Sequence, residues 1–173
     1  GHFSVALLLP RGSKQNQRSP LRGRMLSRDF TGSYTSARMF AYDFQEALDI
    51  LPEISAEAGL KYERVCVLGG DFYSNVLLDQ PPPGLDCMVL LSPNRFWYGR
   101  DLSAAPPDQL RETPVLMFAT RRFGYELSFF QEQLPMTEVV LAHAAGNGYE
   151  MLYRKPELLE RMILFLKGSR EFT

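Results

Sequence analysis

The order of the apolar segments constrains this chain most, because short apolar runs alternate with longer segments of helical periodicity. The runs rich in strand-forming residues cover 4–9, 64–68, 87–91, 115–119 and 138–141. These runs are continuous rather than alternating in polarity, which is typical of strands covered on both faces. We therefore expect the α/β class, a three-layer sandwich with a mostly parallel open sheet of about five strands.

Helical patterns fill the intervals between these runs. The predicted helices cover 36–58, 72–78, 125–134 and 156–167. In the first of them Pro52 predicts a break or a kink, and Gly59 is placed as a C-terminal cap. The stretch 10–35, between the first strand and the first helix, is too long to be a simple connection.

Composition limits the domain organisation and the partners. The chain has 173 residues, 45% of them hydrophobic and 23% charged, so we expect one domain over residues 1–173. A net charge of −1 provides no global field that would attract nucleic acid. Six basic residues between 11 and 28 form either a phosphate-binding surface or a solvated loop, and we expect no nucleic-acid partner. No apolar run is long enough to cross a membrane.

The cysteines and histidines give little material for a metal site or a disulfide framework. Cys66 and Cys87 both lie inside apolar runs, which favours reduced core thiols and therefore a cytoplasmic location. Two histidines and two cysteines without paired ligand spacing predict no metal site. We expect no cofactor.

The carboxyl ends of the strands are where ligands bind in a parallel sheet of this kind. The segments that follow the predicted strands cover 10–12, 69–74, 92–95, 120–122 and 142–148. We expect a candidate site assembled from these segments.

Several segments resemble, in order and spacing, the later part of an α/β-hydrolase of the esterase, lipase and dienelactone-hydrolase superfamily. RVCVLGGDFYSN resembles the strand, nucleophile elbow and helix of that family, and PVLMFATRR resembles the strand before the catalytic acid. VVLAHAAGNGYEML, followed by PELLERMILFL, resembles the histidine loop and the terminal helix. The resemblance extends over residues 3–166. It implies early strands that this sequence does not contain. Either the sheet closes the gap without them, or an oligomer or another segment completes the sheet, or the chain is a fragment lacking them.

The catalytic positions implied by this resemblance hold unusual residues. Asp71, in the run Gly-Gly-Asp-Phe-Tyr at 69–73, stands at the position of the nucleophilic serine. Arg122 falls at the acid position and Asn147 at the histidine position. An amide such as that of Asn147 cannot act as a general base near neutral pH. The resemblance thus implies a degenerate triad and a non-catalytic binding or interaction module.

An active enzyme is the alternative. Asp71 resembles the carboxylate nucleophile of some members of the superfamily, and His143, four residues before Asn147, could then be an unconventional base. Catalytic parts could also be supplied upstream of residue 1. The substrate would be ester-like or a related small molecule. These two residues could instead have structural roles only. Asp71 would then be the N-cap of the helix that begins at Phe72, and His143 would be a polar residue at the start of a loop.

Two arginines and an aromatic group complete the candidates. Arg121 and Arg122 could clamp a small acyl, carboxylate or phosphate ligand, together with amides near Gly69 and Gly70. Alternatively, one arginine pairs with an acid such as Asp71 while the other is solvated. The aromatic run at 96–98 could line a pocket or cover the core.

Overall fold

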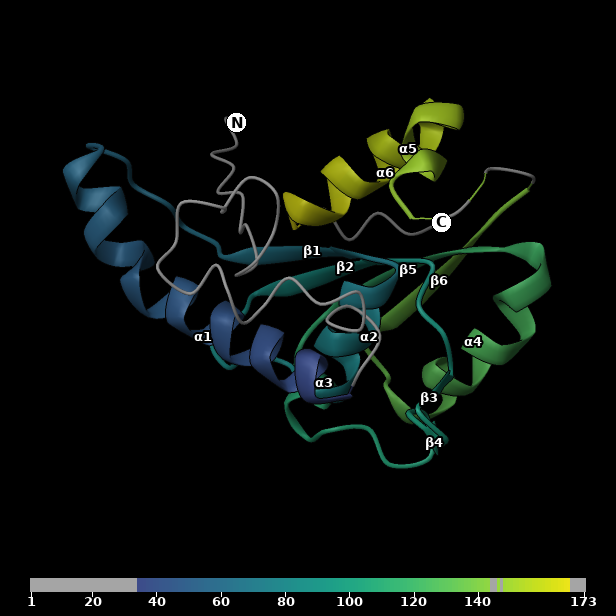
Figure 1. Cartoon of the computed structure of the whole chain (residues 1–173). Coiled ribbons are helices and arrows are strands. Elements are labelled where there is room, and N and C mark those ends of the chain that lie inside the picture. The colour runs from purple at the N-terminus through teal and green to yellow at the C-terminus, as the bar shows by residue number, and fades with distance from the viewer. Residues whose placement is uncertain (1–33, 144–145, 147, 169–173) are drawn as a thin grey trace, which may run out of the picture. The chain divides into compact units, whose positions relative to one another are not determined.

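The computed structural model describes residues 34–143, 146 and 148–168, without the side chains of 34–37 and 122. Figure 1 shows the whole chain. It divides into two compact units, Gly1–Glu63 and Arg64–Thr173, which we describe separately. The expected strand at 4–9 and the basic residues of 11–28 lie outside the described residues. The single domain over residues 1–173 therefore stays a prediction.

The first unit contributes one long helix, α1 (Tyr34–Glu57). The expected break at Pro52 is wrong, because α1 continues through this residue for more than a turn. Gly59 ends the helix as predicted: its φ is 65°, and its N–H donates to the carbonyl of Ala56 at 3.1 Å. The N–H of Leu60 donates to the carbonyl of Ser55 at 2.8 Å, which completes a Schellman cap.

The second unit contains a parallel sheet, which confirms the α/β class. Its strands are β1 (Cys66–Gly70), β2 (Cys87–Leu91), β5 (Val115–Thr120) and β6 (Thr137–Ala142), in the order β1-β2-β5-β6. All three pairings are parallel, so the four carboxyl ends lie at the same end of the sheet. Four of the five predicted strands are thus found at or within three residues of their expected bounds.

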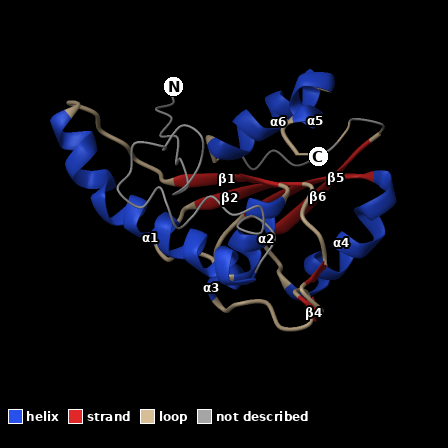
Figure 2. Cartoon of the chain, viewed as in Figure 1, coloured by secondary structure: helices blue, strands red, loops and turns tan. Residues whose placement is uncertain are grey.

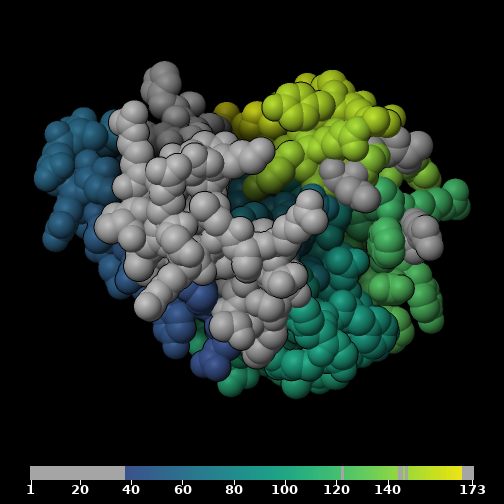
Figure 3. Space-filling model, viewed as in Figure 1, coloured from purple at the N-terminus to yellow at the C-terminus, as the bar shows by residue number. Residues whose placement is uncertain are grey.

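Helices lie on both faces of this sheet (Figures 1 and 2). On one face are α2 (Phe72–Asp79), α3 (Gln109–Glu112) and α4 (Arg121–Gln133). On the other face are α5 (Glu150–Arg154) and α6 (Pro156–Leu166). The space-filling view shows the same separation, with the yellow-green atoms of the α5 region on one side and the green atoms of the α4 region on the other (Figure 3). A two-stranded antiparallel ribbon pairs β3 (Phe96–Trp97) with β4 (Arg100–Asp101).

The core explains why the strand segments are continuously apolar. Every residue of β2 is buried, and successive side chains point to opposite faces. Cys87, Val89 and Leu91 pack in one cluster with side chains of α5 and α6. Met88 and Leu90, which are fully buried, point to the face that carries α2 and α4. A strand that is covered on both faces has no solvent-exposed side for polar residues, so its sequence is apolar throughout.

Among the residues that the structure describes, no helix combines the length and the apolar character needed to cross a lipid bilayer.

Candidate functional site

The candidate site is built on the connection between β1 and α2, which consists of Asp71 alone. Asp71 has φ 49° and ψ −112°, a conformation that is strained for any residue with a side chain. Its N–H donates to the carbonyl of Leu91, at the end of β2, over 2.8 Å. This sharp strand-to-helix turn is the form that a nucleophile elbow takes.

The residues around Asp71 explain why the turn can be this tight. A Cβ added to Gly69 would lie 2.7 Å from Cδ1 of Leu77 and 3.1 Å from the backbone nitrogen of Ser74, so α2 packs directly on the backbone of β1. The Ser74 hydroxyl, which is fully buried, lies 2.8 Å from the carbonyl oxygen of Gly69 and 2.9 Å from that of Leu91. Ser74 therefore holds the turn together.

The Asp71 side chain does not cap α2. It accepts no hydrogen bond from the first turn of that helix, so the interpretation of Asp71 as a side-chain N-cap is wrong. The backbone explains the difference, because an N-cap residue normally has extended φ and ψ, which aim its side chain at the helix amides. The carboxylate lies instead against Gly148, where an added Cβ would overlap Oδ2. Asp71 is exposed as a whole residue, but its carboxyl group loses part of its hydration in this position, which raises its pKa.

The loop after β6 closes the site from the other side. Ser92, which follows β2 and has φ 55°, accepts a hydrogen bond from the N–H of Gly148 at 2.8 Å. Its hydroxyl also lies 3.7 Å from the Sδ atom of Met151 in α5. These contacts fasten the loop across the ends of β1 and β2, and thereby bring Gly148 to Asp71.

Two tyrosines, Tyr73 in α2 and Tyr149 just before α5, lie near the turn. The ring of Tyr149 packs on Gly70, where an added Cβ would lie 2.7 Å from Cε2. Burial raises the pKa of the Tyr149 phenol, and the negative charge of Asp71 raises it further. Burial also raises the pKa of Tyr73, with a smaller effect from Tyr149. Both phenols therefore stay neutral at neutral pH, and that of Tyr149 lies close enough to Asp71 to be affected by its charge.

Of His143 and Asn147, the structure describes His143 alone. His143 is exposed just beyond β6, and no hydrogen bond or ion pair between described residues joins it to Asp71. Asn147 lies outside the described residues. No contact between described residues supports His143 as a base for Asp71.

The arginines occupy a helix rather than a loop. The helix expected to begin at Tyr125 begins at Arg121, so Arg121 and Arg122 lie in the first turn of α4. Arg121 is exposed, and the side chain of Arg122 lies outside the described residues. Gly69 and Gly70 belong to β1, paired in register with β2, and Gly70 is covered by a tyrosine ring. The expected anion clamp of two arginines and glycine amides remains a prediction without a contact to support it.

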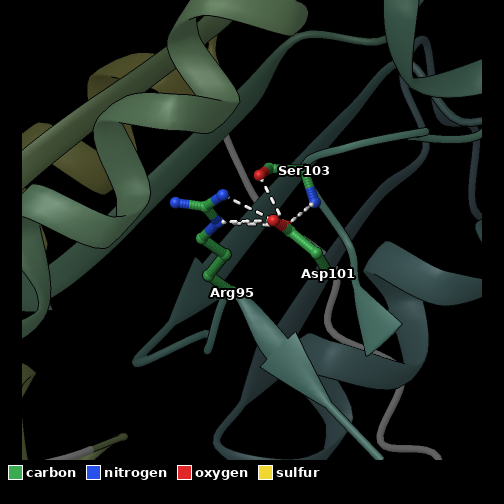
Figure 4. Close-up of polar contacts among 3 residues, drawn as sticks. All are labelled: Arg95, Asp101 and Ser103. Carbon is green, nitrogen blue, oxygen red and sulfur yellow. Dashed lines mark hydrogen bonds and ion pairs between the residues drawn. The ribbon is translucent and has the colours of Figure 1, made fainter. Parts of the chain in front are cut away.

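The aromatic run divides between core and surface. Trp97 is buried, and its ring centroid lies 5.2 Å from that of Phe72, the residue after Asp71. The ribbon that carries Trp97 is braced by Asp101, which accepts hydrogen bonds from Arg95 and Ser103 (Figure 4). These bonds, first those from Arg95, hold the pKa of Asp101 well below its usual range. The Arg95 guanidinium also lies 3.7 Å from the centroid of the Phe129 ring in α4.

The chemistry available at the site is that of a carboxylate with the neutral phenol of Tyr149 close by. Such a group accepts hydrogen bonds and attracts positive charge. Within the described ranges, no group of three or more His, Cys, Asp or Glu side chains is placed to hold a metal ion.

Sequence reasoning missed Ser92 and Tyr149 as contributors to this site. Ser92 belongs to a strand-end segment that was expected to contribute, but nothing in its type or spacing singled it out. Tyr149 is one residue beyond the strand-end segment 142–148. Proximity to the carboxyl ends of the strands was the signal that could have found both.

Comparison of the chain with protein-family models, with curated proteins and with solved structures finds no match.

Proposed function

We propose that this chain is an α/β-hydrolase-like protein with a degenerate catalytic triad, which binds a small ligand at Asp71 and does not hydrolyse esters. The strained elbow is the main support for the proposal. Asp71 has an unfavourable backbone conformation, with φ 49°, although its side chain does not stabilise α2. A strained residue persists where the surrounding structure holds it, and such residues concentrate at functional sites. A carboxylate placed in this way has a role in binding or in chemistry.

The topology supports the hydrolase-like part of the proposal. The resemblance implies an elbow after one strand, an acid two strands later and a histidine loop after the next strand. The order β1-β2-β5-β6 has a strained turn after β1, a helix start after β5 and a loop after β6 that returns to the elbow. The family assignment itself rests on this arrangement and on the sequence segments together.

The absence of a base beside Asp71 in the described residues favours binding over catalysis. A carboxylate nucleophile forms an ester that must be cleaved by activated water, and this step needs a group that accepts a proton. The nearest predicted base, His143, is exposed and has no described contact with Asp71. The exposed carboxylate instead favours a ligand that donates a hydrogen bond or carries a positive charge.

The test compares ester turnover with ligand binding in the wild type and in Asp71→Asn. Short-chain p-nitrophenyl esters are expected to be hydrolysed equally slowly by both proteins and by Glu157→Gln, a control that changes an exposed acid on α6. A ligand found by thermal-shift screening of small amines and alcohols should bind Asp71→Asn roughly tenfold or more weakly, because a charge-assisted hydrogen bond is lost. Ester turnover that Asp71→Asn abolishes would overturn the binding proposal.

A carboxylate nucleophile is the second candidate, and the elbow conformation is the observation that favours it. Its signature is a covalent ester at Asp71, which mass spectrometry of peptides would detect after incubation with an alkyl halide or an epoxide. His143→Gln should prolong the life of that ester if His143 activates the water. An unmodified Asp71 peptide under all these conditions would exclude this candidate.

A further inference from the structure

The two cysteines of the chain are direct neighbours in the sheet. Cys66 opens β1, Cys87 opens β2, and the two residues are register partners in the parallel pairing of these strands. Both side chains belong to the same face, where Cys87 is part of the core cluster and Cys66 packs against it. The two thiols therefore face each other across the strand pair, and both are free.

The spacing suits a strained disulfide. Neighbouring strands lie about 4.8 Å apart, which is within the range of about 4.4–6.8 Å that disulfides span between Cα atoms. The Cβ atoms of a disulfide must approach to about 3.5–4.5 Å, so the two strands would have to draw together slightly. A disulfide under such strain is reduced more easily than one that staples a secreted domain, which makes the link reversible.

The surroundings give the two thiols different roles. Cys66 is partly exposed, whereas Cys87 is fully buried. The hydrogen bond with Cys87 lowers the pKa of the Cys66 thiol, and the positive charge of Arg64 acts in the same direction. The same hydrogen bond raises the pKa of Cys87, to which burial adds. Cys66 is thus the thiol that an oxidant can reach as a thiolate, and Cys87 is placed to resolve the product.

We propose that Cys66 and Cys87 form a redox modification site, which a low-molecular-weight disulfide such as oxidised glutathione converts to a reversible disulfide between β1 and β2. The Cys66 thiolate attacks one sulfur of the oxidant and releases one glutathione thiolate. Cys87 then loses its proton to that thiolate and attacks the Cys66 sulfur of the mixed disulfide. The second glutathione thiolate leaves and takes up the proton that Cys66 lost. Two electrons pass from the cysteines to the oxidant, and two molecules of reduced glutathione are formed.

The inference goes beyond the proposed ligand site, although the two share their strands. β1 leads from Cys66 to the Asp71 turn, and β2 leads from Cys87 to Ser92. A covalent link between these strands at their amino ends would tie together the two elements whose carboxyl ends hold the site. Neither Asp71 nor ligand binding is needed for the link to form, so each proposal can fail without the other.

The test is a thiol count on the folded protein. The reduced chain is incubated with oxidised glutathione, quenched with N-ethylmaleimide and weighed intact by mass spectrometry. Because the chain has only two cysteines, the expected product has lost two hydrogens and takes up no maleimide. Treatment with dithiothreitol should then restore two maleimide-reactive thiols once the protein is unfolded.

Single substitutions assign the roles of the two thiols. Cys87→Ser should stop at a stable glutathione adduct on Cys66, and Cys66→Ser should leave the buried Cys87 unmodified while the protein is folded. Circular dichroism checks that each variant is folded, and the wild-type result stands without them. A persistent glutathione adduct on the wild type, disulfide-linked dimers, or an internal disulfide that forms only in denaturant would each overturn the proposal.

Discussion

Two strand-to-helix connections in the same sheet are built in different ways. β1 passes to α2 through Asp71, with φ 49° and ψ −112°, whereas β5 passes to α4 through Thr120, with φ −69° and ψ 154°. Neither residue caps its helix with a side-chain hydrogen bond. Thr120 nevertheless has the ordinary extended backbone of an N-cap, while Asp71 has a strained one. A direct passage from a parallel strand to a helix therefore does not require a positive φ.

The residues that precede the two connections differ in their side chains. β1 ends in Gly69 and Gly70, which lie close to α2 and to Tyr149, whereas β5 carries the buried side chains of Phe118 and Ala119 before Thr120. Because the residues before the first connection have no side chains, α2 and Tyr149 lie directly against its backbone. The strain at Asp71 is therefore local to the first connection, where Gly69 and Gly70 allow the close contacts that hold it.

The largest expected effect is that of Gly69→Ala. The new methyl group would meet the backbone of α2 and the side chain of Leu77, and overpacking of this kind costs about 1–3 kcal/mol. Urea unfolding measures the loss of stability. Ala119→Gly, near the second connection, should cost no more than about 1 kcal/mol, since it only removes a methyl group from a strand. An unchanged unfolding midpoint for Gly69→Ala would show that α2 does not need the glycine.

Removal of the buried hydroxyl at the first connection should have the next largest effect. Ser74→Ala deletes the contacts with the carbonyls of Gly69 and Leu91, which should lower the free energy of unfolding by roughly 1–1.5 kcal/mol. The matched control is Ser128→Ala in α4, whose exposed hydroxyl donates to the carbonyl of Tyr125 at 2.7 Å. Chemical denaturation should leave the control near the wild type, and equal losses for both variants would contradict the role given to Ser74.

Glycine at each connection tests the strain itself. Asp71→Gly should stabilise the protein by about 0.5–1 kcal/mol, because glycine adopts a positive φ without a steric penalty. Thr120→Gly should instead destabilise it by up to about 1 kcal/mol, since Thr120 already has a favourable backbone. The two midpoints in urea should therefore move in opposite directions. A loss of stability on Asp71→Gly would mean that the carboxylate supports the fold.

The smallest effect concerns pH. Burial raises the pKa of Asp71 above its ordinary value of 3.8, so the folded state binds this proton more tightly than the unfolded state. The resulting stability is fully present below pH 3.8 and is lost as the pH rises through the folded pKa. Asp71→Asn should therefore gain stability relative to the wild type between acid and neutral pH, as measured by unfolding at a series of pH values.

Asp101 supplies the control of opposite sign for this pH series. Its pKa is lowered by Arg95, so its contribution is present above the unfolded pKa and is lost as the pH falls through the folded pKa. Asp101→Asn should accordingly lose stability relative to the wild type as the pH rises from acid to neutral. Parallel profiles for the two variants would contradict the environment assigned to Asp71.

The strands of the parallel sheet could be predicted because burial on both faces produces continuous apolar runs in the sequence. β2 was expected at 87–91 and is found as Cys87–Leu91, since a strand buried on both faces must be apolar throughout. The start of α4 was missed, because Arg121 and Arg122 interrupt the apolar periodicity that reveals a helix. The short elements α3, α5, β3 and β4 carry too little pattern to be recognised.

The candidate site was predictable only in part. Asp71 was singled out because the family resemblance puts it at the nucleophile position. Its residue type favoured a cap, and the backbone that excludes this role follows from contacts with β2 and α2. Ser92 and Gly148 are 56 residues apart, and their hydrogen bond depends on how β2 and β6 are placed in the sheet. Local sequence does not encode such a meeting.

The sequence by itself determined the α/β class, the positions of the four strands of the parallel sheet and the residue at the turn after β1, because these depend on local apolar patterning and on chain order. Only the tertiary structure decided that Asp71 is strained and uncapped, that the loop after β6 folds back onto it, and that Cys66 faces Cys87. The physical reason is that backbone strain and side-chain meetings are set by contacts between residues far apart along the chain, which packing selects only when the whole sheet has formed.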